Sequence, residues 1–155
     1  MKKIIFRLTL PLTLISFGII TKWSYGIAID AKDVFFYGFP MIYKCEGFHT
    51  SLSTQYFLIE MTINLLTYFA FCLIITLTLN RIWKINISKR ISKIFWIVYA
   101  VLFLGFAYLS NDLDDRYSIK RDFEIKIFDS GITIFGIHST DREKYQTEYK
   151  NWNGK

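Results

Sequence analysis

The chain has 155 residues, which is enough for one domain, and 52% of them are hydrophobic and 19% aromatic. Its apolar residues come in long runs without a polar face, which argues against a soluble globular protein. The net charge of +6 arises mainly in residues 1–21 and 80–93, which hold three and five basic residues and no acidic residue. This clustering indicates membrane orientation, and no nucleic-acid partner is predicted.

Residues 1–21 are predicted to form a first transmembrane helix or a signal anchor. About 20 mostly apolar residues cross a bilayer, and this run is interrupted only by Arg7, Pro11 and Gly18. A Met-Lys-Lys start before an apolar stretch is also typical of a cleaved signal peptide. Ser24-Tyr25-Gly26 is a poor match to a cleavage site, and both alternatives place the next segment outside.

Residues 22–56 are predicted to form an external aromatic loop. Within it, residues 33–37 have the composition of a strand, which Gly38-Phe39-Pro40 would end. The loop carries six aromatic residues that need burial: Phe35, Phe36, Tyr37, Phe39, Tyr43 and Phe48.

Two short stretches of this loop carry a resemblance. Tyr37-Gly38-Phe39-Pro40, followed by Gly47-Phe48-His49 and then an apolar span, resembles loops in small uncharacterised bacterial inner-membrane proteins. The resemblance implies a bacterial envelope location and no particular activity.

Residues 57–79 and 94–109 are predicted to be the second and third transmembrane helices, joined by a basic loop at 80–93. Short cytoplasmic loops are enriched in Lys and Arg, so this loop is expected in the cytoplasm. The expected location is therefore a multi-pass membrane protein of the bacterial inner membrane, with its amino terminus cytoplasmic and its carboxyl terminus external.

Residues 110–155 are predicted to form an external tail. Strands at 123–128 and 132–137 would pair as a hairpin around Asp129-Ser130-Gly131, and a capping box at Thr140 and Glu143 would start a short helix over 141–150. These elements are too few for a core of their own. We therefore expect them to pack on residues 22–56, which gives a fold class of three transmembrane helices with a small external α+β portion.

One candidate site lies in the second predicted span. Glu60, Asn64 and Thr67 are spaced i, i+4 and i+7 and so share a helix face. One interpretation is a carboxylate that reaches water at the interface, beside a hydrogen-bonding seam between helices. The alternative is a proton or ion site.

A second candidate surface is the basic loop. It carries the side chains Arg81, Lys84, Lys89, Arg90 and Lys93. Beside an anionic cytoplasmic leaflet they would contact membrane lipids, and a cytoplasmic protein partner is the alternative.

No catalytic residue, cofactor or metal site is predicted. Asp112, Asp114 and Asp115 lack the spacing of a calcium loop, and His49 and His138 lack nearby ligands. Cys45 and Cys72 are expected at different depths, so they should not pair, although Cys45 could bond to a partner.

Two functions follow from this pattern. The chain is expected to be a non-catalytic accessory or scaffold subunit of a cell-envelope complex, with an envelope protein as partner. The alternative is a small transporter or ion-coupled membrane module, which would need polar residues deep in at least two spans.

Overall fold

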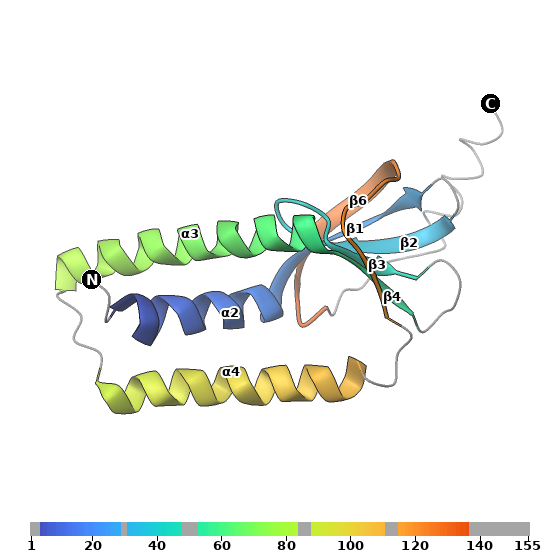
Figure 1. Cartoon of the computed structure of the whole chain (residues 1–155). Coiled ribbons are helices and arrows are strands. Elements are labelled where there is room, and N and C mark those ends of the chain that lie inside the picture. Colours follow the sequence, from blue (N-terminus) through green and yellow to red (C-terminus); the bar gives the residue numbers. More distant parts are fainter. Residues whose placement is uncertain (1–3, 29–30, 48–52, 84–87, 111–114, 137–155) are drawn as a thin grey trace.

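The computed structural model places three helices side by side, with a sheet at one end of them (Figure 1). The structure describes residues 4–28, 31–47, 53–83, 88–110 and 115–136. In chain order, the elements are η1 (Ile5–Thr9), α2 (Leu10–Ile19), β1 (Ile20–Ala28), β2 (Ala31–Tyr37), β3 (Lys44–Glu46), β4 (Thr54–Phe57), α3 (Leu58–Trp83), α4 (Lys89–Ser110), β5 (Arg116–Ser118) and β6 (Ile125–Ile134).

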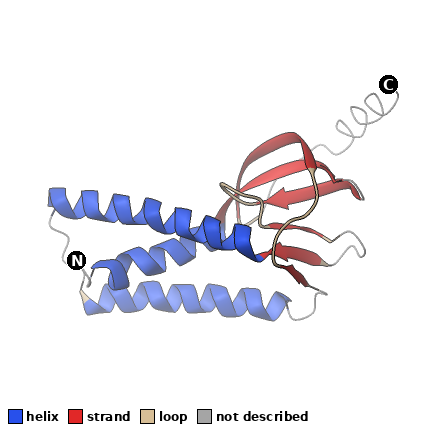
Figure 2. Cartoon of the chain, turned by 45° about the horizontal axis from the view of Figure 1, so that its top comes forward, coloured by secondary structure: helices blue, strands red, loops and turns tan. Residues whose placement is uncertain are grey.

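The sheet has six strands in the order β5-β4-β3-β2-β1-β6. Neighbours are antiparallel, except that β5 runs parallel to β4. The chain leaves the sheet through α3 and returns through α4, and its last two strands then join opposite edges. Figure 2 shows the resulting strands gathered at the end of the helices.

Both faces of the sheet carry apolar clusters. Successive strand residues point to opposite faces, so Phe35 and Phe36 in β2 enter different clusters, and both are fully buried. Phe36 packs with Cys45 and Phe57, and the Phe123 ring meets the Phe57 ring edge-on at 5.6 Å between centroids. The second cluster contains Trp23, Tyr25 and Phe35. This arrangement gives most of the aromatic residues of segment 22–56 the burial that they require.

The helix α2 packs against both α3 and α4. It runs into β1 without a turn, because Ile20 is already extended, with φ −106° and ψ 122°. The Phe135 N–H donates to the Ile19 carbonyl at 2.8 Å, and the Tyr68 hydroxyl donates to the Ile20 carbonyl at 2.7 Å. These bonds satisfy carbonyls that a helix end leaves open, and they fix the sheet to the helices.

The fold class with three transmembrane helices is wrong. The described residues form a mixed six-stranded sheet on three helices, and one of these helices, α3, is long and apolar enough to cross a membrane. The amino-terminal helix ends at Ile19, and the expected external loop is largely strands β1 to β4. Three of the first five residues of α4 are basic. A multi-pass location is accordingly not supported.

The predicted hairpin is also wrong. β6 continues as a strand through Asp129, Ser130 and Gly131 and pairs with β1 along its length, with one register shift opposite Tyr25 and Gly26. These residues have turn chemistry, but a nine-residue partner strand overrides that local preference. The predicted strand at 33–37 is confirmed within β2, and strand pairing confirms that the carboxyl-terminal segment folds onto residues 22–56. The helix predicted over 141–150 lies outside the described residues.

Candidate functional site

The helix α3 buries polar side chains and exposes apolar ones. Glu60, Asn64, Cys72 and Thr76 are its buried residues, and with the half-buried Tyr68 they recur every four residues along one face. The opposite faces carry exposed Leu66, Phe71, Ile74 and Ile75. This polarity is the reverse of an amphipathic helix on a soluble core and is typical of a helix in lipid.

At the end of α3 far from the sheet, the polar face meets the amino-terminal helix. The Thr76 hydroxyl lies 2.9 Å from the Thr9 hydroxyl, and both side chains are buried. The Thr76 hydroxyl is also 2.8 Å from the Cys72 carbonyl, and the Thr13 hydroxyl donates to the Thr9 carbonyl at 2.8 Å. Hydroxyls bonded in this way let helices approach closely without leaving polar groups open.

At the sheet end, Glu60 holds the segment that follows β5. Its Oε1 accepts a hydrogen bond from the Arg121 N–H at 3.2 Å, and the Ile59 N–H donates to the Ile119 carbonyl at 3.0 Å. Glu60 is only 4% exposed, so the expectation that water solvates its carboxylate is wrong. Its Oε2 is buried and has no hydrogen-bond partner among the described residues.

Asn64 holds the turn after β2. Its amide donates to the Met41 carbonyl and accepts from the Met41 N–H, at 2.5 Å and 2.9 Å. The turn itself needs Gly38, whose φ of +146° places any Cβ on the Met41 carbonyl. The Tyr37-Gly38-Phe39-Pro40 stretch therefore forms a turn that docks on α3, with a cis bond between Phe39 and Pro40.

A row of aromatic residues crosses one face of the sheet. Strand register places Trp23, Tyr37, Lys44, Tyr56 and Tyr117 opposite one another on five successive strands. The Lys44 ammonium lies 5.7 Å from the centroids of both the Tyr37 and the Tyr56 rings, and burial lowers the pKa of Lys44. The Tyr56 ring stacks on the Tyr117 ring at 5.4 Å. This row stiffens the sheet through cross-strand pairs.

Cys45 lies beneath this row, on the opposite face of the sheet. It is fully buried, and burial raises the pKa of its thiol to about 12. The thiolate is the reactive form of cysteine. The structure therefore does not favour the possible bond from Cys45 to a partner, and Cys72 is buried as well.

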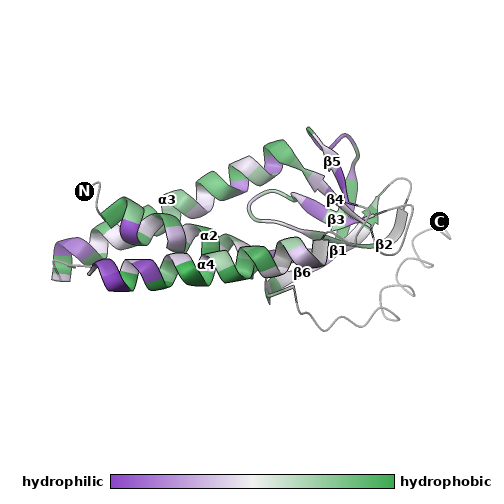
Figure 3. Cartoon of the chain, turned by 60° about the horizontal axis from the view of Figure 1, so that its bottom comes forward, coloured by the Kyte–Doolittle hydropathy of each residue, from purple (hydrophilic) through white to green (hydrophobic). Residues whose placement is uncertain are grey.

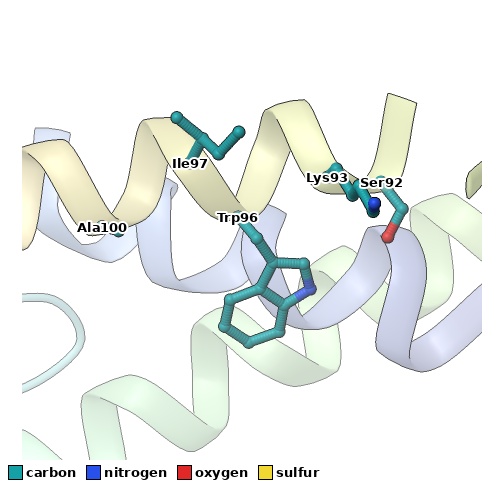
Figure 4. A pocket seen from close by; sticks show the side chains of 5 residues that line it. All are labelled: Ser92, Lys93, Trp96, Ile97 and Ala100. Carbon is teal, nitrogen blue, oxygen red and sulfur yellow. The ribbon is translucent and has the colours of Figure 1, made fainter. Parts of the chain in front are cut away.

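The basic residues gather at the end of the helices far from the sheet, where Figure 3 shows hydrophilic colour on α3 and α4. The side chains of Arg81, Lys89, Arg90 and Lys93 are exposed there. Lys84 lies outside the described residues. On α4, Lys93 also borders a shallow groove lined by Ser92, Trp96, Ile97 and Ala100 (Figure 4).

The structure brings only part of the predicted polar face together. Glu60 and Asn64 share the buried face of α3, whereas Thr67 lies off it and bonds to the Ile63 carbonyl of its own helix. The sequence reasoning missed Tyr68, Cys72 and Thr76, which a strict spacing of four residues would have found. Within the described segments, no group of three His, Cys, Asp or Glu residues could hold a metal ion.

The polar face of α3 docks the rest of the fold, since Glu60, Asn64, Tyr68 and Thr76 each bond to a different segment. His49, His138, Asp112 and Asp114 lie outside the described residues.

Comparison of the chain with protein-family models, with curated proteins and with solved structures finds no match.

Proposed function

We propose that this chain is a membrane-anchored, non-catalytic subunit of a cell-envelope complex, in which α3 enters the bilayer and the sheet contacts a partner protein. The observation that carries the proposal is the inverted polarity of α3. Only 17% of the apolar 18-residue stretch that qualifies it as a span is buried, whereas the core helix of a soluble protein is mostly buried. Along the sequence, α3 follows β4 and precedes β5, and these two strands pair in one sheet. The helix is therefore part of the folded unit and not a leader.

The two ends of α3 differ in a way that supports an orientation. Arg81, Lys89, Arg90 and Lys93 gather at one end, and the sheet lies at the other (Figure 3). Basic residues near a span favour the cytoplasmic side. We therefore place the basic end in the cytoplasm and the sheet on the external face, as the resemblance to bacterial inner-membrane proteins implies.

The contact surface in this proposal is the pair of sheet edges. β5 and β6 each pair with one neighbour, and their outer edges pair with no described strand. Tyr117, Ile119 and Ile132 are 65%, 75% and 79% exposed. Open edges with exposed apolar residues are unfavourable in an isolated protein and are typical of surfaces that bind another chain.

The alternative of an ion-coupled module has less support. It would need polar groups that line an open path, whereas Thr9 and Thr76 bond to each other and Asn64 bonds to the Met41 backbone. These bonds favour a structural role for the polar face of α3.

Site-specific photo-crosslinking of the full-length protein in its native membranes tests the proposal. A crosslinker at Tyr117 or Ile132 should give one discrete protein adduct, and the same crosslinker at Phe71 or Ile74 on α3 should give lipid adducts. The protein should also stay in the membrane pellet after carbonate extraction. Release by carbonate would overturn the anchor, and lipid or scattered adducts from the sheet positions would overturn the partner surface.

A further inference from the structure

A groove on α4 is bordered by polar side chains at one end and by apolar side chains along the rest of its length. Ser92 and Lys93 lie at one end, and Trp96, Ile97 and Ala100 continue from them along the helix (Figure 4). The groove is open and has a volume of about 360 Å³. The eight steps from Ser92 to Ala100 correspond to about 12 Å along a helix that rises about 1.5 Å per residue.

The apolar wall of the groove is held in place. The Trp96 Nε1–H donates to the Phe6 carbonyl at 3.3 Å, and the Trp96 ring packs edge-on against the Tyr99 ring at 6.0 Å between centroids. Ala100 has a small side chain, so it leaves the hollow open beside the indole. These two contacts fix the indole between η1 and α4.

The polar end of the groove is strongly cationic. Lys93 borders the hollow, and exposed Lys89 and Arg90 lie one turn earlier on the same helix. The sequence contains no Asp or Glu from Met61 to Asn111. No acidic residue close in the sequence therefore compensates these charges, and they would attract an anion.

We propose that this groove binds an anionic phospholipid, with the phosphate at Lys93 and Ser92 and an acyl chain along Trp96, Ile97 and Ala100. A cation cluster beside a narrow apolar hollow matches the two halves of such a lipid. A zwitterionic lipid would bring its own cation toward Lys93, so the charge favours an anionic headgroup. The proposal rests on the membrane anchor proposed above, because α4 packs on α2 and η1, the same helices that α3 contacts.

Native mass spectrometry of the full-length protein in mild detergent tests this site. With equal amounts of phosphatidylglycerol and phosphatidylcholine, one phosphatidylglycerol molecule should stay bound in preference. Lys93→Gln should lower this preference about fivefold, the factor expected from about 1 kcal/mol per basic side chain. Ala100→Trp should fill the hollow and remove the bound lipid.

Two control variants test whether the effects on lipid binding are specific to the groove. Ala107→Trp adds the same side chain at another exposed position of α4, and Lys120→Gln removes an exposed charge at the sheet end; both should bind lipid like the wild type. Equal binding of the two lipids by the wild type, or equal effects of Ala100→Trp and Ala107→Trp, would overturn the site. If Ala100→Trp does not fold, the lipid preference of Lys93→Gln alone decides, and an unchanged preference overturns the site.

Carbonate extraction of the same variants separates this proposal from the anchor. Loss of lipid preference in a protein that stays in the membrane pellet overturns the groove alone. Release of the wild-type protein by carbonate overturns the anchor itself.

Discussion

The side chain of Asn64 makes both backbone hydrogen bonds of Met41, at 2.9 Å to its N–H and 2.5 Å to its carbonyl. Asn64 is fully buried and lies on α3, whereas Met41 belongs to the turn between β2 and β3. The Asn64 amide therefore supplies the two hydrogen bonds that a neighbouring strand would otherwise give Met41, and it attaches this end of the sheet to α3. The neighbouring Gly38 and cis Phe39-Pro40 bond shape the turn that brings Met41 to this position.

Removal of this amide should loosen the junction between the sheet and α3. Asn64→Leu leaves the partly buried backbone N–H and carbonyl of Met41 without their side-chain partner, and we expect a loss of about 2–4 kcal/mol in the free energy of unfolding. Thermal unfolding in detergent measures it. Thr62→Val is the matched control, because Thr62 is exposed and bonds only to its own helix; an equal loss in both variants would contradict the role of Asn64.

Glu60 leads to a prediction that separates its hydrogen bond from its charge. Glu60→Gln keeps an oxygen that can accept from the Arg121 N–H and removes a buried charge that costs free energy. This variant should be as stable as the wild type or more stable. Glu60→Ala loses the acceptor and should cost about 1–3 kcal/mol.

Denaturant unfolding of the two Glu60 variants, with segment 119–121 probed by limited proteolysis, checks the ranking. Glu60→Ala alone should increase cleavage near Arg121. A Glu60→Gln protein as unstable as Glu60→Ala would mean that the charge itself stabilises the fold.

The sequence predicted α3 well, because its apolar run has no rival interpretation: residues 57–79 were expected and Leu58–Trp83 is observed. It did not predict that α2 runs directly into β1. Gly18 lies one residue before the end of α2, but it stands inside an apolar run and is followed by the β-branched Ile19, Ile20 and Thr21, so the sequence reads as one continuous span.

The sheet edges show why the rest of the fold was missed. β6 pairs with β1 across about a hundred residues, and β5 pairs with β4 across the whole of α3 and α4. Such pairs are set by tertiary packing, which local periodicity does not report. The same limit explains Asn64, whose face was predicted from its spacing but whose partner, Met41, comes from a turn on the sheet.

Burial of the Cys45 thiol and the Tyr43 hydroxyl makes the free energy of unfolding depend on pH in the alkaline range. Burial raises the pKa of Cys45 from 9.0 and of Tyr43 from 10.0, each to about 12. Above pH 9 the unfolded chain releases these protons while the folded chain retains them, so stability falls as the pH rises from 9 to 12. The stabilisation is complete below pH 9.

The slope of the unfolding temperature between pH 8 and pH 11 measures this effect. Cys45→Ala should lower the temperature at every pH but give a shallower slope than the wild type. Thiol alkylation at pH 8 should leave native Cys45 unmodified and label an exposed Ile119→Cys quickly. Parallel slopes, or rapid native labelling of Cys45, would contradict the burial of this thiol.

The contact between Gly131 and Trp23 gives a prediction about the aromatic row. These residues face each other across β6 and β1, and a Cβ at position 131 would lie 2.8 Å from the Trp23 Nε1 atom. The indole therefore occupies the space that a side chain at position 131 would take. Gly131→Val should displace the ring and cost about 1–3 kcal/mol, the usual range for overpacking.

A second substitution distinguishes a clash from a loss of backbone freedom. Trp23→Phe shortens the ring, so the double variant should be more stable than the sum of the two single effects predicts. Ser130→Val is the control, because Ser130 is exposed on the same strand and Val favours strands; it should change stability little. Unfolding free energies of the four proteins in the cycle measure the coupling. Strict additivity would mean that the Trp23 ring does not clash with a side chain at position 131.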